Sequence, residues 1–511
     1  MKRFVRNFLP ILLLIVFTCW RTEAQQVRDT LATFRLEPKA LKEDFQFLRR
    51  ILTETHPGLY RYSSNEMMDK RLDSLSSLLN KPMMFYDYYL MLSWLIADIR
   101  CAHTHLMPLK NFEAYYVRGI KTFPLILFYT EGKYFVTLNG TTDTVIKPGF
   151  ELLTINGRQI REIRSQLLNH LWADGYNETS KTKATTNAFF PLFYYLLVER
   201  PGSFEITFKD LNGEEGRIRV QAQTYAETEK FYQKNPVNRE ILAKYKSQNK
   251  LDRKNGWRMK VQKEENVAIL RINGFGGGKN EEEARMKMQK FLDGCMKQLR
   301  QEKIQNLIID LRFNGGGWDI QGVELFTYIM KSPARCYRRL HSVTDSSEFL
   351  RFSDLSPADR KNVKKELKRE PDNTFSVREE FSPQLKMQSP KANGFKGRVY
   401  VLSNGGSGST TSEFIAYSKS HGAITLIGEE TGGAYEGGNG GSFLNFVLPH
   451  SKISIGTPLL YYDNEVTPPN QPGRGTMPDF SVPYNIEDVL KGFDTQLNFA
   501  LKLIQKEGLN K

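Results

Sequence analysis

The sequence predicts an α/β protein whose C-terminal half contains a mainly parallel sheet covered by helices. From residue 262 onward, apolar strand patterns alternate with amphipathic helix patterns, and this alternation is typical of β-α-β units. The first unit has strands at Asn266–Ile272 and Asn306–Leu311 around a helix at Glu281–Glu302. The second has strands at Val399–Ser403 and Ala423–Ile427 around a helix at about Thr411–His421.

The N-terminal residues 1–24 have the pattern of a secretory signal peptide. Three basic residues precede an apolar run, Phe8 to Phe17, and small residues stand at 22 and 24, before the expected cleavage point. The run is shorter than the ~20 residues that a membrane span needs. We expect a secreted or periplasmic protein without a membrane span. A lipoprotein anchored through Cys19 fits less well, because Phe17-Thr18 does not supply the small residues that usually precede a lipidated cysteine.

Residues 25–112 are predicted to form a helical N-terminal domain. Apolar residues recur at three- and four-residue spacing in Leu41–Leu52 and Met67–Leu79, with a break at His56-Pro57-Gly58. A third, strongly apolar helix is expected at Tyr86–Ile99.

Residues 113–225 change to short β-rich runs, with strands expected at Phe123–Tyr129, Tyr134–Leu138 and Phe204–Phe208. Residues 148–157 (PGFELLTING) read as a turn, a strand and an Asn-Gly turn. This stretch resembles the hallmark segment of PDZ domains, which bind peptide C termini by adding a strand to a sheet edge.

The remaining boundaries follow from composition. Residues 226–261 are polar and are predicted to be a linker with some helix, and residues 262–511 are predicted to form the α/β core. Residues 335–395 are charged and rich in turn residues, so we expect an insertion there. An amphipathic helix is predicted from Ile486 to the C terminus.

Composition excludes several classes of protein. With 511 residues, 40% hydrophobic and 25% charged, the chain is neither disordered, nor fibrous, nor a polytopic membrane protein. Its net charge of +15 is not organised for nucleic acid, because the most basic run, Lys361–Arg369, lies among acidic residues and lacks interleaved aromatic residues. Three of the 4 cysteines remain after cleavage, which indicates neither a disulfide framework nor a cysteine metal site. We expect Cys295 to be buried.

Two glycine-rich loops follow strands of the α/β unit, where such folds place their sites. They are Asp310–Gly317 (DLRFNGGG) and Asn404–Glu413 (NGGSGSTTSE). Glycine lets the backbone approach a ligand, and a following helix N-terminus directs free N–H groups toward negative charge, so both loops suit an oxyanion hole. A nucleotide loop is disfavoured because no Lys-Ser/Thr follows the glycines. The alternative is that both loops are simple tight turns.

Within the second loop, the spacing of Thr410 and Glu413 predicts a capping box, which would occupy the Thr410 hydroxyl with backbone. Ser409 would then lie on the turn with its hydroxyl free. A serine attacks only when a base accepts its proton. Sequence spacing does not select this base among the 7 histidines: His56, His103, His105, His170, His341, His421 and His450.

Taken together, these motifs resemble those of the tail-specific and tricorn-like serine peptidases, the group that includes the C-terminal processing peptidases. The resemblance covers nearly all of the mature chain. Its markers are HPGLY at 56–60, IRCAHTHLMP at 99–108, the PDZ-like stretch, IIDLRFNGGG at 308–317, NGGSGSTTSEFIA at 404–416, IGEETGG at 427–433 and GTMPDF at 475–480. It implies a crotonase-like (ClpP/crotonase) protease core with a helical N-terminal region and a PDZ-like β-rich domain.

Carried over residue by residue, the resemblance implies that Ser409 is the nucleophile and His103 the general base. Family members with Ser-x-x-Glu would place Thr410 in the nucleophile's role, whereas those with an extra residue before the Glu favour Ser409. The capping argument also favours Ser409. The backbone of Gly315 and Gly316 and the N–H of Thr410 are implied to be the oxyanion donors.

The chain departs from the family pattern at three positions. Ala434 stands where the processing-peptidase branch has a catalytic Lys, which favours the tricorn-like Ser/His branch. That branch has a Ser before the His, where this chain has Ala102, and a Glu ahead of the closing G-x-x-P-D segment, which has no match here. Asp463 and Glu465 are the nearest acids, and Glu465 is the candidate to orient His103.

The resemblance thus implies an exported serine endopeptidase that cleaves unfolded proteins or peptides through an acyl-enzyme, with no cofactor and no metal. Two other histidines have secondary interpretations: we expect His56 to be a structural hydrogen-bonding group, and His105 is the fallback base. The alternative function is a non-catalytic ligand- or peptide-binding protein of the same fold, since the family's fold also occurs in retinoid-carrying proteins. The oligomeric state does not follow from the sequence.

Overall fold

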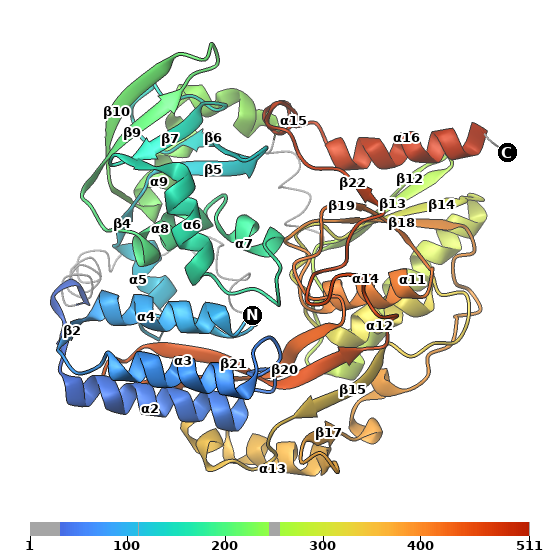
Figure 1. Cartoon of the computed structure of the whole chain (residues 1–511). Helices are drawn as coiled ribbons and strands as arrows, with labels where there is room; N and C mark the ends of the chain where they lie inside the picture. Colours follow the sequence, from blue (N-terminus) through green and yellow to red (C-terminus); the bar gives the residue numbers. More distant parts are fainter. Residues whose placement is uncertain (1–30, 111, 245–255, 510–511) are drawn as a thin grey trace, which may run out of the picture.

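The computed structural model describes residues 31–110, 112–244 and 256–509 (Figure 1). The predicted signal peptide, residues 1–24 with Cys19, therefore lies outside the described residues. Over the described ranges, no helix combines the length and the apolar character that crossing a membrane requires.

Three helices form the N-terminal region, close to where the hydrophobic periodicity predicts them: α2 (Pro38–Thr55), α3 (Asn65–Ser77) and α4 (Phe85–Asp98). Helix α2 begins with a proline. Proline has no N–H, and this costs nothing there because the first N–H groups of a helix have no partner within it. Helix α3 begins where the Ser64 side chain accepts the Met67 N–H. Two-residue strands β1 (Arg35–Leu36) and β2 (Met83–Met84) pair beside them.

The middle region contains an antiparallel sheet in the order β10-β9-β7-β6-β5, with β8 paired to β7. Its strands are β5 (Leu125–Thr130), β6 (Lys133–Asn139), β7 (Glu151–Ile155), β8 (Arg158–Gln159), β9 (Ser203–Lys209) and β10 (Glu215–Gln221). The helices of this region are α5 (Phe112–Arg118), α6 (Ile160–His170), α7 (Thr179–Ala184) and α8 (Phe189–Leu197), and β4 (Lys121–Thr122) pairs with β11 (Gln223–Thr224). The predicted Asn-Gly turn joins β7 to β8, because Asn156 and Gly157 both have positive φ, 49° and 77°.

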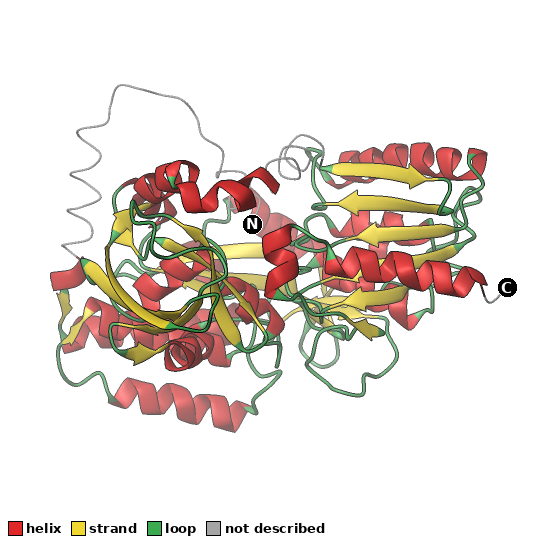
Figure 2. Cartoon of the chain, turned by 90° about the horizontal axis from the view of Figure 1, so that it is seen from above, coloured by secondary structure: helices red, strands yellow, loops and turns green. Residues whose placement is uncertain are grey.

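The C-terminal core is a six-stranded sheet in the order β12-β13-β14-β18-β19-β22 (Figure 2). Its parallel strands are β13 (Val267–Ile272), β14 (Asn306–Asp310), β18 (Arg398–Ser403), β19 (Thr425–Gly428) and β22 (Phe480–Ser481). Buried side chains alternate between its two faces, so that Leu307 and Ile309 pack with helices α11 (Glu281–Gln301), α12 (Asp319–Thr327) and α14 (Thr410–Ser420). Ile308 packs on the opposite face with α16 (Thr495–Leu509). The predicted parallel α/β sheet is confirmed.

A second sheet, in the order β16-β17-β15-β21-β20, links this core to the N-terminal region. Its long hairpin is β20 (Gly437–Val447) and β21 (Ser454–Asn464), and the other strands are β15 (Tyr337–Ser342), β16 (Leu367–Arg369) and β17 (Phe375–Val377). The hairpin extends from the core to the N-terminal helices α2, α3 and α4 (Figure 1). There Leu444 and Phe446 join the same buried cluster as Leu48 of α2.

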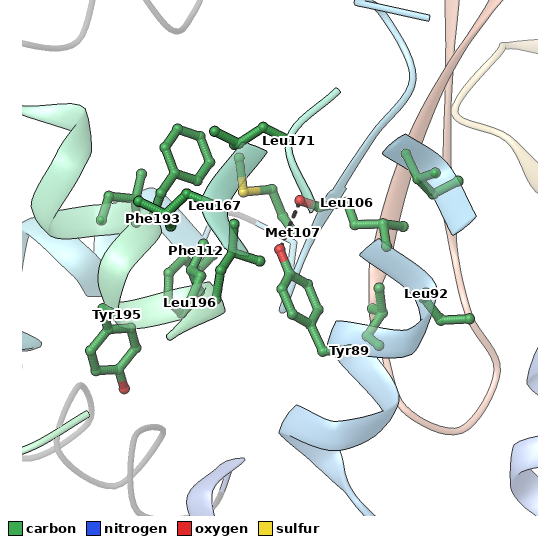
Figure 3. Packing of buried hydrophobic residues seen from close by; sticks show 14 of the residues in the cluster. Tyr89, Leu92, Leu106, Met107, Phe112, Leu167, Leu171, Phe193, Tyr195 and Leu196 are labelled. Atoms are coloured by element: carbon green, nitrogen blue, oxygen red, sulfur yellow. Dashed lines mark hydrogen bonds between the residues drawn. The ribbon is translucent and has the colours of Figure 1, made fainter. Parts of the chain in front are cut away.

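The apolar cluster in Figure 3 fixes the segment that follows His103. Strand β3 (His105–Met107) pairs with β21 of the second sheet, with His105 opposite Gly456. Leu106 and Met107 are buried in this cluster with Leu92 of α4 and Leu167 of α6, and the Tyr89 hydroxyl donates to the Leu106 carbonyl at 3.2 Å. Burial of these side chains holds the loop before β3 against the core.

Several boundaries differ from those predicted. The segment 226–261 contains most of helix α9 (Tyr225–Lys234), the short 3₁₀ turn η1 (Pro236–Asn238) and most of edge strand β12 (Trp257–Gln262), so the core sheet begins before residue 262. The segment 335–395 contributes β15, β16 and β17 to the second sheet and adds helix α13 (Pro357–Glu366). It also contains the 3₁₀ turns η2 (Glu348–Phe352), η3 (Glu379–Phe381) and η4 (Pro383–Leu385).

The single C-terminal helix predicted from Ile486 is wrong. Helix α15 (Ile486–Lys491) ends at Gly492, whose φ of 66° is left-handed, and α16 starts at Thr495. The physical reason is the C-terminal glycine signal inside the apolar pattern: a residue with positive φ stops the helix, and glycine adopts that conformation without a steric penalty.

A buried ion-pair network holds the start of the first glycine loop. The Arg312 guanidinium donates to both carboxylate oxygens of Asp310, at 2.9 and 2.7 Å, and to both of Asp494, at 2.6 and 2.7 Å. Arg271 forms a further ion pair with Asp310. Burial alone would raise the pKa of Asp310, but these two cations more than offset it and hold that pKa at about 2. The network connects β14 and its loop to the segment before α16.

We expect Arg312→Met to lower the free energy of unfolding by about 3–5 kcal/mol, because it would leave the buried carboxylate of Asp310 without its main partner. Urea unfolding followed by circular dichroism measures the change. The matched control is Lys491→Met, which breaks the exposed pair with Glu487 and is expected to cost less than about 0.5 kcal/mol. Equal losses in the two variants would contradict the structural role of Arg312.

Candidate active site

Ser409 lies at a sharp, strained turn between β18 and α14. Its φ of 52° and ψ of −134° are a conformation that non-glycine residues rarely adopt, and such strain persists only where the surroundings impose it. Those surroundings are hydrogen bonds to the first glycine loop. The Ser407 hydroxyl donates to the Leu311 carbonyl at 2.9 Å, and the Gly408 N–H donates to the Asn314 carbonyl at 3.1 Å.

The two hydroxyls at the start of α14 have different environments. Ser409 occupies the N-cap position without a side-chain hydrogen bond to the helix and is half-buried. The Thr410 hydroxyl is buried and donates to the Gly317 carbonyl at 3.1 Å. The geometry therefore leaves the Ser409 hydroxyl available and occupies that of Thr410.

The predicted capping box of Thr410 and Glu413 is wrong. Ser409, not Thr410, caps α14, and the Glu413 N–H donates to the Ser409 carbonyl at 3.1 Å. The Glu413 carboxyl instead accepts the Tyr337 hydroxyl at 2.7 Å. Burial raises the pKa of Glu413 to about 8, so this acid is largely uncharged at neutral pH.

The first glycine loop is in close contact with the strained turn at Ser409, the Ser409 elbow. Gly316 has a φ of 94°, and a Cβ on it would lie 2.7 Å from Ser409 Cβ and 3.0 Å from the Thr410 nitrogen. The Thr410 N–H is the first of α14, and such N–H groups have no partner within the helix. The Gly316 N–H already donates to the Asn314 side chain at 3.0 Å. Of the three N–H groups that the resemblance implies as oxyanion donors, those of Thr410 and of the exposed Gly315 therefore remain available.

His103 lies on the loop between α4 and β3 and is 9% exposed. Its neighbour Thr104 is fixed by His56, whose Nε2 lies 2.7 Å from the Thr104 hydroxyl and whose Nδ1 accepts the Gly58 N–H at 3.1 Å. Among the described residues, the buried Nδ1 of His103 has no hydrogen-bond partner. His56 thus occupies a structural hydrogen-bonding position, and His103 keeps a ring nitrogen unengaged.

Asp174, on the segment between α6 and α7, is the acid beside this loop. It is 4% exposed, and its Oδ1 accepts the N–H of Ala102 at 2.8 Å. A Cβ on Gly438 would lie 3.2 Å from Asp174 Oδ2. The next residue, Asn439, contacts His103 through its backbone. Burial lowers the pKa of His103, and the Asp174 charge and the Asn439 backbone oppose this. Burial raises the pKa of Asp174, and the His103 charge and the Ala102 N–H oppose it.

One segment of the core, Gly433–Asn439, contacts both halves of the site. The Gly433 N–H donates to the hydroxyl of Ser412, in the first turn of α14, at 2.9 Å. A Cβ on Gly433 would lie 3.5 Å from Asp174 Oδ2, and the Asn439 backbone contacts the His103 ring. The structure therefore brings the elbow, Asp174 and the His103 loop to the same segment.

Two other candidates lie elsewhere. The Glu465 side chain is 39% exposed and 3.4 Å from the Arg338 guanidinium, and its neighbour Asp463 pairs with the same arginine at 3.3 Å. Of the two carboxylates, it is the charge of Asp174 that raises the pKa of His103. His105 packs against Trp172, with ring centroids 5.8 Å apart, and burial lowers its pKa to about 4.

Sequence reasoning missed Asp174 because it lies 71 positions after His103 in the β-rich region, within a Trp-Ala-Asp-Gly stretch that matches no motif. Only the fold brings it to the His103 loop. The described residues contain no group of three or more His, Cys, Asp or Glu side chains that could hold a metal ion.

Comparison with known proteins identifies the core of the chain. Residues 266–446, from β13 to β20, match the model for peptidase family S41. The matched residues include both glycine-rich loops and Ser409. Through this match the chain is identified as a serine-type peptidase, a hydrolase. No curated protein gives a significant match.

Solved structures resemble this peptidase over almost its whole length. Mature CPAF has a TM-score of 0.57 at 13% identity, covering 92% of this chain and 98% of that one. Mature CPAF complexed with lactacystin has a TM-score of 0.57 at 14% identity, covering 93% and 99%. The photosystem II D1 C-terminal processing protease has a TM-score of 0.38 at 13% identity, covering 89% and 98%. At these identities the CPAF structures indicate a shared fold.

We expect Gly316→Ala to reduce peptide cleavage by the peptidase about 100-fold or more while the protein still folds. The added methyl group would displace Ser409 or the Thr410 nitrogen, and displacements of about 1 Å at a catalytic centre have effects of this size. Cleavage rates and circular dichroism check the two parts. Gly294→Ala in α11 is the control, because a Cβ there meets nothing within 4 Å. Full activity in Gly316→Ala would contradict the tight contact.

Proposed function

We propose that this peptidase is an exported serine endopeptidase that cleaves unfolded proteins or peptides with Ser409 as nucleophile and His103 as general base. The observation that carries the proposal is the Ser409 elbow: a strained backbone with an available hydroxyl, in contact with Gly316 and the first N–H of a helix. Strain of this kind at a strand-to-helix turn is the geometry of a nucleophile elbow.

In the first step, Ser409 Oγ attacks the carbonyl carbon of the scissile peptide bond and His103 accepts its proton. The negative charge that forms on the carbonyl oxygen is stabilised by the N–H of Thr410 and that of Gly315, aided by the positive end of α14. Protonated His103 then donates the proton to the leaving amine. Water, activated by the same imidazole, hydrolyses the acyl-enzyme and restores the Ser409 hydroxyl.

Asp174 takes the role of orienting His103 in this proposal, in place of Glu465. Its carboxylate is held by the Ala102 N–H beside His103 and raises the pKa of that imidazole. A carboxylate in this position stabilises the imidazolium that forms during the reaction. Because burial lowers the pKa of His103, the ring is neutral and able to accept a proton near pH 7.

The middle domain is proposed to be PDZ-like and to present substrate to the site. Its helix α7 contacts the core segment that precedes Gly433: the Thr179 hydroxyl donates to Glu430 at 2.8 Å, and Lys183 forms an ion pair with Glu429 at 2.8 Å. Glu429 also accepts the Gly405 N–H at 3.4 Å, in the loop that leads to Ser409. Export to the periplasm or outside the cell rests on the signal-peptide pattern of residues 1–24.

Substitution at the two adjacent hydroxyls tests the nucleophile. We expect Ser409→Ala and His103→Ala each to lower kcat for unfolded protein substrates by about 10⁴-fold or more. Thr410→Val, which removes only the hydrogen bond to Gly317, should lower it less than about tenfold. Labelling of the wild type by an active-serine probe, and its loss in Ser409→Ala, gives a second readout. A wild-type protein that cleaves nothing and takes up no probe would support the non-catalytic binding function instead.

The pH profile tests the orienting acid. We expect Asp174→Asn to lower kcat/KM by about 10²–10⁴-fold and to shift its acidic limb to lower pH. The shift follows because the Asp174 charge raises the pKa of His103, so that its removal lowers this pKa further. Glu465→Gln is the matched control and should leave the profile unchanged, since Glu465 pairs with Arg338. A shift in Glu465→Gln alone would reverse the assignment.

A further inference from the structure

Strand β20 forms one edge of the second sheet, and its outer side passes the catalytic histidine. The sheet order ends β15-β21-β20, so β20 has a partner on one side only. An edge strand presents unpaired N–H and C=O groups that can pair with another extended chain. The inference below rests on the proposed peptidase function.

Two positions at the start of β20 already use their outer backbone groups. The Gly437 N–H donates to the Ala434 carbonyl at 3.3 Å, and the Gly437 carbonyl accepts from Arg61 at 3.0 Å. Two residues further along, the Asn439 backbone bonds to His103. In an antiparallel strand, alternate residues direct both backbone groups to the same side, so Gly437 and Asn439 define the outer edge.

The outer backbone groups at the far end of β20 are also hydrogen-bonded, to Asp354 in the loop after η2. The Asn445 N–H donates to the Asp354 carboxylate at 2.9 Å, and the Asp354 N–H donates to the Asn445 carbonyl at 3.1 Å. Asn445 therefore faces its backbone groups outward. Phe443 lies two residues before Asn445 in an unbroken register and must do the same. Its partner on the inner side is Pro458, which has no N–H to donate.

The outer backbone groups of Phe443 are consequently open. Within the described ranges, no side chain or backbone group bonds to its N–H or carbonyl on the outer side. The register shifts between Gly440 and Phe443, and the three consecutive residues Gly441, Ser442 and Phe443 are exposed, whereas the strand beyond them alternates regularly between buried and exposed. The Phe443 ring is 39% exposed, and its centroid lies 5.3 Å from that of His103.

Glycine in a strand also marks a place where another backbone can approach closely. Gly437, Gly438, Gly440 and Gly441 surround Asn439 at this edge. An extended chain lying beside Phe443 would reach the His103 ring, which packs against the Phe443 ring. A peptide substrate is the occupant that fits, because the opening begins beside the general base of a peptidase and ends at Asp354.

We propose that the substrate peptide binds as an additional β-strand on the outer edge of β20, exchanging main-chain hydrogen bonds with Phe443 and resting an apolar side chain on the Phe443 ring. Asp354 ends this docking edge. Main-chain pairing of this kind gives affinity without demanding a particular sequence, and side-chain preference arises at alternate positions. Unfolded segments that can become extended would therefore be cleaved, and folded proteins would not.

The test uses a peptide that the full-length wild type cleaves at one bond and that Ser409→Ala does not cleave. Analogues are N-methylated one at a time at residues on either side of that bond. We expect kcat/KM to fall about tenfold or more at one position and to change little at its neighbours, because one peptide N–H pairs with the Phe443 carbonyl while the outer groups of Asn439 and Asn445 are already engaged. Equal losses at all positions, or none, would overturn strand pairing. The proposed peptidase function would stand in that case, whereas a wild type that cleaves no peptide overturns both.

Two variants of Phe443 test the contribution of β20 to the proposed pairing with the substrate strand. Phe443→Ala keeps the N–H and removes the ring, and we expect lower kcat/KM chiefly for peptides with an apolar residue at the contacting position. Phe443→Pro also removes the outward N–H, which an edge strand tolerates, and should be about tenfold worse than Phe443→Ala. Phe493→Ala, at a ring 50% exposed in the turn before α16, is the matched control. Equal rates for Phe443→Pro and Phe443→Ala would contradict the pairing.

Discussion

The pairing of β3 with β21 is the interaction on which the proposed active site depends. Three backbone positions, His105 to Met107, attach the N-terminal region to a strand of the core hairpin, and the next residues toward the N terminus carry His103. Apolar burial around Leu106 and the His56–Thr104 hydrogen bond then fix the loop. Ser409 is held separately by the strands of the α/β sheet. The loop of His103 and the turn at Ser409 reach the same segment because the β20–β21 hairpin packs both with the N-terminal helices and with the α/β core.

The motifs that carry the family resemblance have distinct physical tasks. In DLRFNGGG, the charged residues form a buried network, and Gly316 approaches Ser409. In IGEETGG, the Glu430 carboxylate binds the Arg474 guanidinium at 2.8 and 2.6 Å and the Gly475 N–H at 2.8 Å, which docks the following GTMPDF segment. Asp479 of that segment accepts the N–H of Leu426 in β19. Most motif residues therefore hold the loops that place the few reactive groups.

Periodicity predicted the elements whose stabilising contacts are local or regular. The three N-terminal helices and the β-α-β units follow from apolar spacing, and the Asn-Gly turn follows from its positive φ preference. The β20–β21 hairpin was not predicted, because its glycines and its register shift hide the alternation. The Ser409 loop could be located from its glycines, but the capping of α14 could not, since the Thr410 hydroxyl bonds to Gly317 and the Glu413 carboxyl to Tyr337, two tertiary contacts that the Thr-x-x-Glu pattern does not reveal. Asp174 becomes part of the site only through tertiary packing.

The anchoring of the first glycine loop by Asp494 couples the turn at Ser409 to a distant part of the chain. The Arg312 guanidinium binds Asp310 and Asp494 at once, so the loop in contact with Ser409 is fully held only when the segment before α16 is docked against the core. A disturbance of that docking would reach the loop without touching any residue of the candidate site. The position of the loop is therefore a property of the whole α/β core.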